Sequence, residues 1–443
     1  MGEMDWTGRK LHFIAIGGAG MSGLALVCHR LGARVTGSDR AESSYLDRLR
    51  EAGIDLRVGH DADSVPPDAE VVVSTAIGDD NPELVRARER GQAVLHRGAL
   101  LAELCAEGRL IAVAGTHGKT TTTGMLVHAL RELGEDPSFF IGGELPGVGS
   151  GGSAANAGSG EGDWMVAEAD ESDASFLELA PEIAVVTNVE LDHHARWSSR
   201  AELTEAFARF AEGARGVVLG EGLDPIAGGR DFERFSESNP GPAELGLRVP
   251  GRHNILNARA ALAALTVAGF DQEAAARALS TFPGMLRRQE LKGELEGALV
   301  YDDYAHHPTE VRATLQALRE LQPKRLLAVF QPHLYSRTKA LADDFGAALA
   351  SADEVGVLDV YAAREEPVEG VSGLLVARAT ADRAGGRPVL WLRDLETAAR
   401  ELPTRLREDD LLVTIGAGDI TKLAEDLAGT PSAPDAKRRS RRA

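Results

Sequence analysis

The segment Arg109–Gly124 constrains the fold of this chain most strongly, because it joins a short apolar run to a helical pattern through a glycine turn. Its sequence is RLIAVAGTHGKTTTTG. The run Leu110–Ala114 predicts a buried strand that stops at Gly115. Further on, leucines at positions 126, 130 and 133 share one helical face. The segment therefore predicts a strand, a tight turn and a helix in direct succession.

The turn itself has the composition of a phosphate-binding loop. Glycines let backbone N–H groups converge on an oxyanion, and the following helix N-terminus adds partial positive charge. Lys119 can reach terminal phosphates, and the Thr120 hydroxyl can ligate magnesium. Val113 occupies the place of the first glycine in G-x-x-x-x-G-K, so this loop is shorter than the standard one. A purely structural turn with an incidental lysine is the alternative.

Composition limits the possible partners. A chain of 443 residues predicts two to four domains, and 43% hydrophobic with 26% charged residues is ordinary for a globular protein. The net charge of −20 argues against nucleic acid or an anionic membrane as a main partner. Anionic nucleotides must then be bound by local lysines, arginines, backbone N–H groups and metal.

The expected location is the cytoplasm. The two cysteines, Cys28 and Cys105, form neither a disulfide framework nor a zinc spacing, so a reducing compartment is expected. The acidic start, MGEMDW, lacks the apolar region of a secretory signal. No apolar run approaches the length of a membrane span, so we expect no membrane insertion.

A second glycine turn lies near the start of the chain. Leu11–Ile16 predicts a strand, Gly17–Gly23 a turn, and the apolar pattern through Leu31 a helix. A further strand ends at Asp39. The spacing G-x-G-x-x-G, with an acid about 20 residues on, is the layout of a dinucleotide-binding fold. Asp39 could hold the ribose of NAD or another nucleotide, or be a solvated loop acid.

More of this first α/β unit follows. Glu70–Thr75 predicts a strand whose end, Ser74–Ile77, is where ligands bind in parallel sheets. A helix over 82–90 and a short strand at Val94–Leu95 continue the alternation. His96 and Arg97 then precede a helix that runs to Cys105. The first domain should end at residue 108.

Acidic residues cluster in the middle of the chain. After a strand at Ser138–Ile141, the Gly/Ser-rich stretch Gly142–Gly162 predicts a mobile surface excursion. The strand Trp164–Val166 follows, and the segment Glu168–Asp173 then carries four carboxylates. Carboxylates at a strand end, downstream of a phosphate loop, suit a magnesium site. A solvated acidic loop is the alternative.

Three further places carry candidate polar residues. His193 follows the strand Ile183–Val186 among acids, where a histidine can be a ligand, a base or structural. Asn254 precedes an Ala-rich helix, so an N-cap role would explain it without any ligand. Arg287 and Arg288 follow a Pro-Gly break and could clamp a phosphate or be surface charges.

The last third of the chain alternates strands and helices in the pattern of a doubly wound sheet. Two strand ends carry polar clusters, at Asp302–Pro308 and Gln331–Arg337. We expect these two strands to be neighbours in the sheet, so the two clusters should face one crevice. The basic segment Lys437–Ala443 predicts a disordered tail. The predicted elements are strands at 299–303, 325–330, 354–360, 389–392 and 411–415, and helices at 309–320, 338–350, 373–384, 394–401 and 419–427.

Taken together, these motifs resemble the Mur ligase family of peptidoglycan synthesis, from about residue 11 to residue 427. The combination is far more specific than any single motif. The segments that carry the resemblance are Ile16–Gly23, Ala114–Thr123, Glu168–Phe176, Asp302–Glu310, Phe330–His333, Glu365–Ser372 and Gly416–Ile420.

The resemblance implies three α/β domains: a Rossmann-like UDP-N-acetylmuramate domain (1–108), a central P-loop ATPase-type domain (109–284), and a Rossmann-like, doubly wound amino-acid domain (285–443). Within the family the chain resembles the alanine-adding branch. That branch uses ATP and Mg²⁺ to join L-alanine to UDP-N-acetylmuramate through an acyl phosphate. The alternative is the recycling branch, which adds a tripeptide to the same sugar. The sequence does not indicate an oligomeric state.

The resemblance also assigns roles to matching positions. Catalytic roles fall to Lys119, His193, Arg288, His333 and Arg337, with His333 and Arg337 near the substrate carboxylate and the amino acid. Metal binding falls to Thr120, Glu168 and His193. ATP binding falls to Gly115, Thr116, His117, Gly118, Lys119, Thr120, Thr121, Asn254, Asn257, Asp302 and Asp303. Binding of the UDP-sugar falls to Gly18, Ala19, Gly20, Met21, Ser22, Gly23, Asp39, Ser74, Thr75, Ala76, Ile77, His96 and Arg97.

One difference from sister ligases is visible in the sequence. Several of them bridge metals with a carbamylated lysine in the central domain, but this chain has no lysine between Lys119 and Lys292. The alanine-adding branch also lacks that lysine. The residues after His193 and the Gly/Ser-rich excursion depart from the family pattern. A nicotinamide-dependent oxidoreductase would leave Lys119 and the acidic cluster unexplained, and a non-catalytic regulator would leave the intact metal ligands unexplained.

Overall fold

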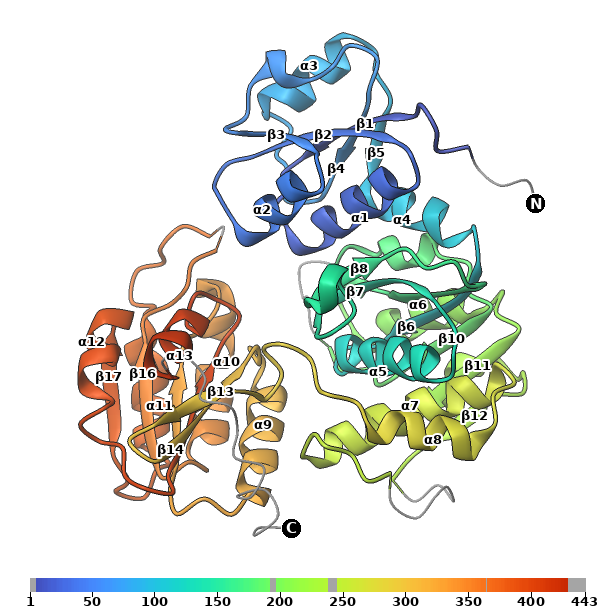
Figure 1. The fold of residues 1–443 in the computed structure, drawn as a ribbon. Coiled ribbons are helices and arrows are strands. Elements are labelled where there is room, and N and C mark those ends of the chain that lie inside the picture. The colour runs from blue at the N-terminus through green and yellow to red at the C-terminus, as the bar shows by residue number, and fades with distance from the viewer. Residues whose placement is uncertain (1–4, 192–196, 238–244, 364, 429–443) are drawn as a thin grey trace. The chain divides into compact units, whose positions relative to one another are not determined.

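The computed structural model describes residues 5–191, 197–237, 245–363 and 365–428 and contains three α/β sheets (Figure 1). They belong to two compact units. The first comprises residues up to Arg248 together with Ile255–Pro283 and holds two of the sheets. The second comprises Val249–Asn254 and the chain from Gly284 and holds the third sheet. Within the described ranges, no helix has the length and apolar composition needed to cross a bilayer.

The N-terminal sheet has five parallel strands in the order β3-β2-β1-β4-β5. Strand order reverses between β1 and β4, and ligands bind at such switch points. The turn after β1 and the segment Ser74–Ile77 after β4 therefore lie at the same edge. The elements are β1 (Lys10–Ile14), α1 (Ala19–Arg30), β2 (Arg34–Asp39), α2 (Ser44–Glu51), β3 (Asp55–Val58), β4 (Glu70–Val73), α3 (Pro82–Glu89), β5 (Val94–His96) and α4 (Arg97–Cys105).

The central sheet has seven strands in the order β12-β11-β10-β6-β9-β7-β8. Its middle strand β6 is buried from Leu110 to Ala114, which explains its unbroken apolar sequence. The elements are β6 (Arg109–Ala114), α5 (Lys119–Glu132), β7 (Ser138–Leu145), β8 (Ala155–Gly158), β9 (Trp164–Glu168), β10 (Ile183–Val186), α6 (Arg200–Ala211), β11 (Gly216–Gly220), β12 (Glu233–Phe235), α7 (Arg252–Val267) and α8 (Gln272–Ser280).

The prediction of a loop over Gly142–Gly162 is partly wrong. Strand β7 continues to Leu145, and β8 pairs with it in antiparallel orientation at the sheet edge. At Gly158 the absence of a side chain lets the backbone of β8 approach the ring of Phe139 on β7. A Cβ at this position would lie 2.6 Å from that ring. Gly158 therefore serves packing inside a hairpin, a use that composition alone does not reveal.

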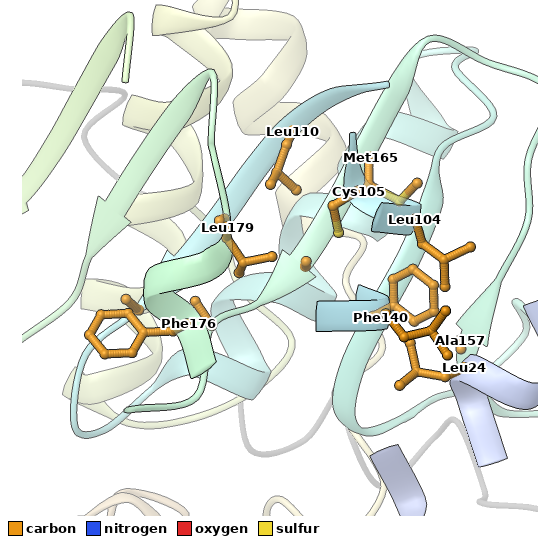
Figure 2. Close-up of a cluster of buried hydrophobic side chains, with 14 of the residues drawn as sticks. Leu24, Leu104, Cys105, Leu110, Phe140, Ala157, Met165, Phe176 and Leu179 are labelled. Carbon is orange, nitrogen blue, oxygen red and sulfur yellow. The ribbon is translucent and has the colours of Figure 1, made fainter. Parts of the chain in front are cut away.

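The first two domains share one hydrophobic cluster (Figure 2). Leu24 of α1 and Leu104 of α4 belong to the N-terminal domain, whereas Phe140 and Met165 belong to strands of the central sheet. All four are buried. Burial of this apolar surface stabilises the first unit as one body. Cys28 and Cys105 are buried free thiols.

The C-terminal sheet has the order β13-β14-β18-β15-β16-β17, with only β13 antiparallel. The predicted strands and helices are present, with small shifts at their ends, but β13 was not predicted. The elements are β13 (Glu290–Leu295), β14 (Ala298–Asp303), α9 (Pro308–Glu320), β15 (Leu326–Phe330), α10 (Tyr335–Leu349), β16 (Glu354–Leu358), α11 (Gly373–Ala381), β17 (Val389–Arg393), α12 (Leu395–Glu401), β18 (Leu411–Ile415) and α13 (Thr421–Ala428).

The polar clusters after β14 and β15 do not follow neighbouring strands, as the sequence suggested, because β18 lies between them. The expectation that they share a crevice edge rested on adjacency in sequence. Parallel strands joined by long crossovers can leave room for a later strand, which here is β18.

Candidate functional site

The phosphate-loop turn depends on glycine for two separate reasons. Gly115 and Gly118 have φ values of 124° and 82°, a region that L side chains rarely adopt. A Cβ at Gly118 would also lie 2.3 Å from Oδ1 of Asn257. Helix α5 starts directly after the turn, at Lys119, so its first N–H groups point into the turn.

A strand end on the neighbouring β10 holds this turn in place. Thr187 Oγ1 donates to the His117 carbonyl at 2.7 Å, and Asn188 Oδ1 accepts from the His117 N–H at 2.9 Å. Thr116 Oγ1 donates to the Glu190 carbonyl at 2.8 Å. These bonds fix the turn before any ligand arrives. The sequence placed this segment at a strand end, but the role of Thr187 and Asn188 was missed.

Lys119 is held by an ion pair inside the first unit. Its Nζ lies 2.8 Å from Oε2 of Glu171 and donates to the Gly115 carbonyl at 2.7 Å. Burial alone would lower the pKa of Lys119, but the carboxylates of Glu171 and Asp170 raise it above its ordinary value. The ammonium is therefore charged at neutral pH and lies at the N-terminus of α5.

Glu168 is fixed on both of its oxygens. Thr120 Oγ1 donates to Oε1 at 3.1 Å, and the Gly142 N–H donates to Oε2 at 2.7 Å. A Cβ at Gly142 would lie 2.7 Å from this carboxylate, so glycine is required for the contact. Hydroxyl and carboxylate oxygens are the donors that Mg²⁺ prefers, so Thr120 and Glu168 fit the predicted metal site. The role of Gly142 was missed.

The acidic segment after β9 is not a solvated loop. Glu171 is 1% exposed and pairs with Lys119. Asp173 Oδ2 lies 2.9 Å from Nη2 of Arg97, and Asp170 Oδ2 lies 3.4 Å from the same nitrogen. The segment therefore contacts Lys119, predicted to bind ATP, and Arg97, predicted to bind the UDP-sugar. The solvated alternative is wrong, because each of these acids has a cationic partner within the fold.

His96 has a structural contact of its own. Its Nδ1 accepts from the Gly98 N–H at 3.2 Å and so caps helix α4. Its Nε2 lies 3.8 Å from Oδ2 of Asp173. A contact to the UDP-sugar stays a prediction for His96 and for Arg97.

In the first glycine turn, Asp39 stabilises the backbone. Its Oδ2 accepts from the Gly17 N–H at 2.8 Å, so it is not merely a solvated loop acid. A Cβ at Gly17 would lie 2.9 Å from that oxygen. Arg97 adjoins the same turn, since a Cβ at Gly20 would lie 3.4 Å from its Nη1. The turn therefore lies between Asp39 and Arg97.

Asn254 is not the N-cap, because α7 begins at Arg252 and Asn254 lies in its first turn. Its Nδ2 donates to the Pro250 carbonyl at 2.7 Å. The start of the helix two residues earlier leaves the cap position to another residue. His193 lies outside the described residues.

Four aromatic rings form a series of contacts beyond the carboxyl ends of β14, β15 and β16 in the C-terminal sheet. Tyr304 and His306 have ring centroids 5.5 Å apart, His306 and His333 6.1 Å, and His333 and Tyr361 5.8 Å. The two polar clusters thus meet, although β18 separates their strands. Arg337 Nη1 lies 3.5 Å from Nδ1 of His333.

His306 is neutral at pH 7. Burial lowers its pKa to about 4. Its Nδ1 lies 3.1 Å from the Tyr304 carbonyl, which can only accept, so Nδ1 carries the proton. The lone pair of the ring is then on Nε2. The sequence placed His306 in the cluster without assigning it a role.

The adjacent arginines differ in their contacts. Arg287 donates to Oδ2 of Asp302 at 3.3 Å and to the Gly416 carbonyl at 2.8 Å. Both guanidinium groups lie over the ring of Tyr304, with Cζ 4.9 Å from the centroid for Arg287 and 5.2 Å for Arg288. Arg287 is thus anchored within the domain, and the assignment of Arg288 to the γ-phosphate stays a prediction.

Asp302 and Asp303 are buried at the end of β14. Asp302 accepts from Thr414 Oγ1 at 2.6 Å. Asp303 accepts from the N–H groups of Gln289 and Ala305, and burial raises its pKa to about 6. A ribose contact stays a prediction for both.

Comparison with known families gives a direct result. A model described as "Mur ligase family, catalytic domain" matches residues 10–109, the Mur ligase middle domain matches 113–219, and the Mur ligase glutamate ligase domain matches 287–418. The chain belongs to the Mur ligase family. The three-domain α/β architecture predicted from the sequence is thereby confirmed.

Individual Mur ligases match over nearly the whole chain. A protein from Mycolicibacterium vanbaalenii named UDP-N-acetylmuramate–L-alanine ligase is 44% identical, covering 95% of each chain. A solved UDP-N-acetylmuramate–alanine ligase from Thermotoga maritima is 29% identical with a TM-score of 0.80, covering 94% of this chain and 98% of that one. A murein peptide ligase from Psychrobacter arcticus is 25% identical with a TM-score of 0.70, covering 96% and 100%.

Proposed function

We propose that this Mur ligase joins L-alanine to the lactyl carboxylate of UDP-N-acetylmuramate at the expense of ATP. The observation that carries the proposal is the 44% identity, over 95% of both chains, to a relative with that name. The phosphate-loop turn supports it, because Lys119 and Glu168 are both held at the N-terminal end of α5. We place the domain boundaries at 108/109 and 284/285 and the enzyme in the cytoplasm.

The ATP phosphates would bind at the turn Gly115–Thr121. The first N–H groups of α5 and the Lys119 ammonium are the donors for phosphate oxygens there. Thr120 and Glu168 would hold Mg²⁺. When bound, the ion offsets the charge on the phosphate oxygens. Asn257 packs against Gly118 and so supports the shape of the turn.

The UDP-sugar would bind at the first glycine turn. The N-terminus of α1 offers N–H groups to the diphosphate, and the segment Ser74–Ile77 lies at the same edge of the sheet. Arg97 adds a cation beside the turn. No lysine occurs between Gly17 and Gly23, so backbone groups carry most of the binding.

The reaction divides into two steps. A lactyl carboxylate oxygen attacks the γ-phosphorus, the bond to the bridging oxygen breaks, and ADP leaves. The neutral amine of L-alanine then attacks the acyl carbon of the acyl phosphate, loses a proton, and inorganic phosphate leaves. Lys119 stabilises charge on the γ-phosphate oxygens in the first step. The roles of His193, Arg288, His333 and Arg337 stay predictions from the family resemblance.

The recycling reaction with a tripeptide is the second candidate, and it has less support. The alanine ligase of Thermotoga maritima has the higher TM-score, 0.80 against 0.70 for the murein peptide ligase. The two activities share the sugar, ATP and almost every motif. Selection of the amino acid therefore separates them.

Phosphate release tests the proposal. The purified enzyme is incubated with UDP-N-acetylmuramate, ATP and Mg²⁺, and with L-alanine, glycine, L-serine or the tripeptide in separate reactions. We expect L-alanine to give the highest kcat/KM. Activity with the tripeptide alone would overturn the proposal in favour of recycling.

A further inference from the structure

The hairpin β7–β8 belongs to the central domain, yet its second strand contacts the helix after the first glycine turn. Asn156 Nδ2 donates to the carbonyl of Ala19, the first residue of α1, at 2.6 Å. The Asn156 side chain is 8% exposed. The central domain therefore holds the turn of the N-terminal domain through a buried hydrogen bond.

Close packing surrounds that bond. A Cβ at Gly23 would lie 2.8 Å from Cβ of Ala157 and 3.4 Å from Nδ2 of Asn156. Figure 2 shows Leu24 beside Ala157 and Phe140 in the shared hydrophobic cluster. The last glycine of G-x-G-x-x-G thus lets α1 approach a strand of another domain. The position of β8 against α1 is tightly defined.

Two side chains donate to one carbonyl in the first turn of α1. Ser22 Oγ also donates to the Ala19 carbonyl, at 3.0 Å. The Ala19 carbonyl and the Gly20 N–H belong to the same planar trans peptide, so they point in opposite directions. Gly20 is in the first turn of α1, so its N–H points out of the helix N-terminus. The bonds from Asn156 and Ser22 to the Ala19 carbonyl hold this peptide group in that orientation.

We propose that Asn156 is a positioning residue for the UDP-sugar, because it aims the Gly20 N–H at the substrate diphosphate. This inference rests on the proposed function, which assigns the first turn to that diphosphate. The other strand of the same hairpin supplies the Gly142 N–H to Glu168. One hairpin thus orients a group in each of the two predicted phosphate sites. The Gly/Ser-rich stretch that departs from the family pattern acquires a function.

The test compares Asn156→Ala with Asn156→Asp. An aspartate side chain has the same shape as asparagine, but its carboxylate cannot donate a hydrogen bond to the Ala19 carbonyl. If that bond is what matters, Asn156→Asp should weaken sugar binding at least as much as Asn156→Ala. We expect KM for UDP-N-acetylmuramate to rise about tenfold, with KM for ATP within about twofold of wild type. Calorimetric titration with UDP-N-acetylmuramate alone should show the same loss. Ser159→Ala, an exposed position after β8, is the matched control.

A second pair of variants guards against misfolding. Gly23→Ala should weaken binding of UDP-N-acetylmuramate, and Ala157→Gly in the same chain should restore part of it by removing the opposing Cβ. Normal sugar affinity in Asn156→Asp, or an equal loss of ATP affinity, would overturn the inference. A wild-type enzyme that neither binds nor uses UDP-N-acetylmuramate would instead overturn the proposed function.

Discussion

Two glycine turns, Gly17–Gly23 after β1 and Gly115–Lys119 after β6, each connect a buried parallel strand to a helix N-terminus. The second turn is held from within its own sheet, by the strand end after β10. The first is held by Asp39 from its own sheet and by Asn156 from another domain. One turn is thus fixed locally, and the other depends on how two domains pack.

The glycines also serve different purposes in the two turns. Gly115 and Gly118 have left-handed backbone conformations. Gly17 and Gly23 do not, but a Cβ on either would collide with Asp39 or Ala157. The phosphate loop therefore needs glycine both for its backbone conformation and for space, and the first turn needs Gly17 and Gly23 for space alone. Substitutions should separate these two requirements.

The largest effect is expected from removing the cation of the second turn. Lys119→Ala should lower kcat about 1,000-fold, because a preorganised charge at the γ-phosphate is lost. A coupled assay for ADP release measures it. No equivalent side chain exists in the first turn, so no single substitution there should be as severe.

Lys119→Ala also leaves Glu171 buried without its partner, which can destabilise the fold. The double variant Lys119→Ala/Glu171→Gln removes that charge and serves as the control. Both variants should be inactive, and the double variant should melt nearer to wild type. ADP release at the wild-type rate in either variant would refute the role of Lys119.

Gly118→Ala should destabilise the enzyme by about 3 kcal/mol, the sum of left-handed strain and overpacking. The new methyl group would lie 2.3 Å from Asn257 Oδ1. Gly53 is the matched control, because its φ is +86° and a Cβ placed on it would have no atom within 4 Å. Gly53→Ala should cost only about 1 kcal/mol. Urea denaturation compares them, and equal midpoints would refute the contribution of Asn257.

Asp39→Ala should affect the first turn alone. Loss of the charge-assisted bond to the Gly17 N–H should raise KM for UDP-N-acetylmuramate about tenfold. Asp39→Asn keeps an acceptor and should have a smaller effect. Steady-state kinetics with each substrate varied in turn provide the readout. A change in KM for ATP of the same size would show that the two turns are not independent.

The smallest effect concerns pH and the C-terminal domain. Burial lowers the pKa of His306 to about 4 from 6.5, so the stability it contributes is present above pH 6.5 and lost as pH falls toward 4. The contribution of Asp303 to stability changes with pH in the opposite direction, because burial raises its pKa from 3.8 to about 6. That contribution is present at low pH and is lost as the pH rises through 6. NMR titration of His306 should give a midpoint well below 6.5. A midpoint near 6.5 would show a solvated ring.

The contrast between the turns also explains what the sequence could predict. The residues of the second turn that the sequence identified are local: two glycines, Lys119 and Thr120 lie within one short motif. Thr187 and Asn188, which hold that turn from about 70 residues away, were missed. The partner of the first turn, Asn156, lies 137 residues from Ala19 along the chain. Its segment is rich in glycine and serine, which favours the prediction of a loop. The hairpin forms because tertiary packing overrides that composition.

The order of strands in the C-terminal sheet could not be predicted from the sequence either. Alternating apolar and helical patterns predicted the strands of the C-terminal domain, because each pattern is local. The insertion of β18 between β14 and β15 depends on which edges pair, and no residue in either strand encodes it. Tyr304, His306 and His333 lie in the predicted polar clusters, but the sequence pointed neither to Tyr361 nor to the order of the four rings.

The most direct test of the central claim, that the two turns bring a sugar carboxylate and ATP together, follows one oxygen atom. UDP-N-acetylmuramate labelled with ¹⁸O in its lactyl carboxylate is incubated with ATP, L-alanine and the enzyme, and the released phosphate is analysed by mass spectrometry. If the carboxylate attacks the γ-phosphorus, each phosphate released carries one ¹⁸O atom from doubly labelled substrate. Unlabelled phosphate, released together with the alanine amide, would contradict the proposed reaction.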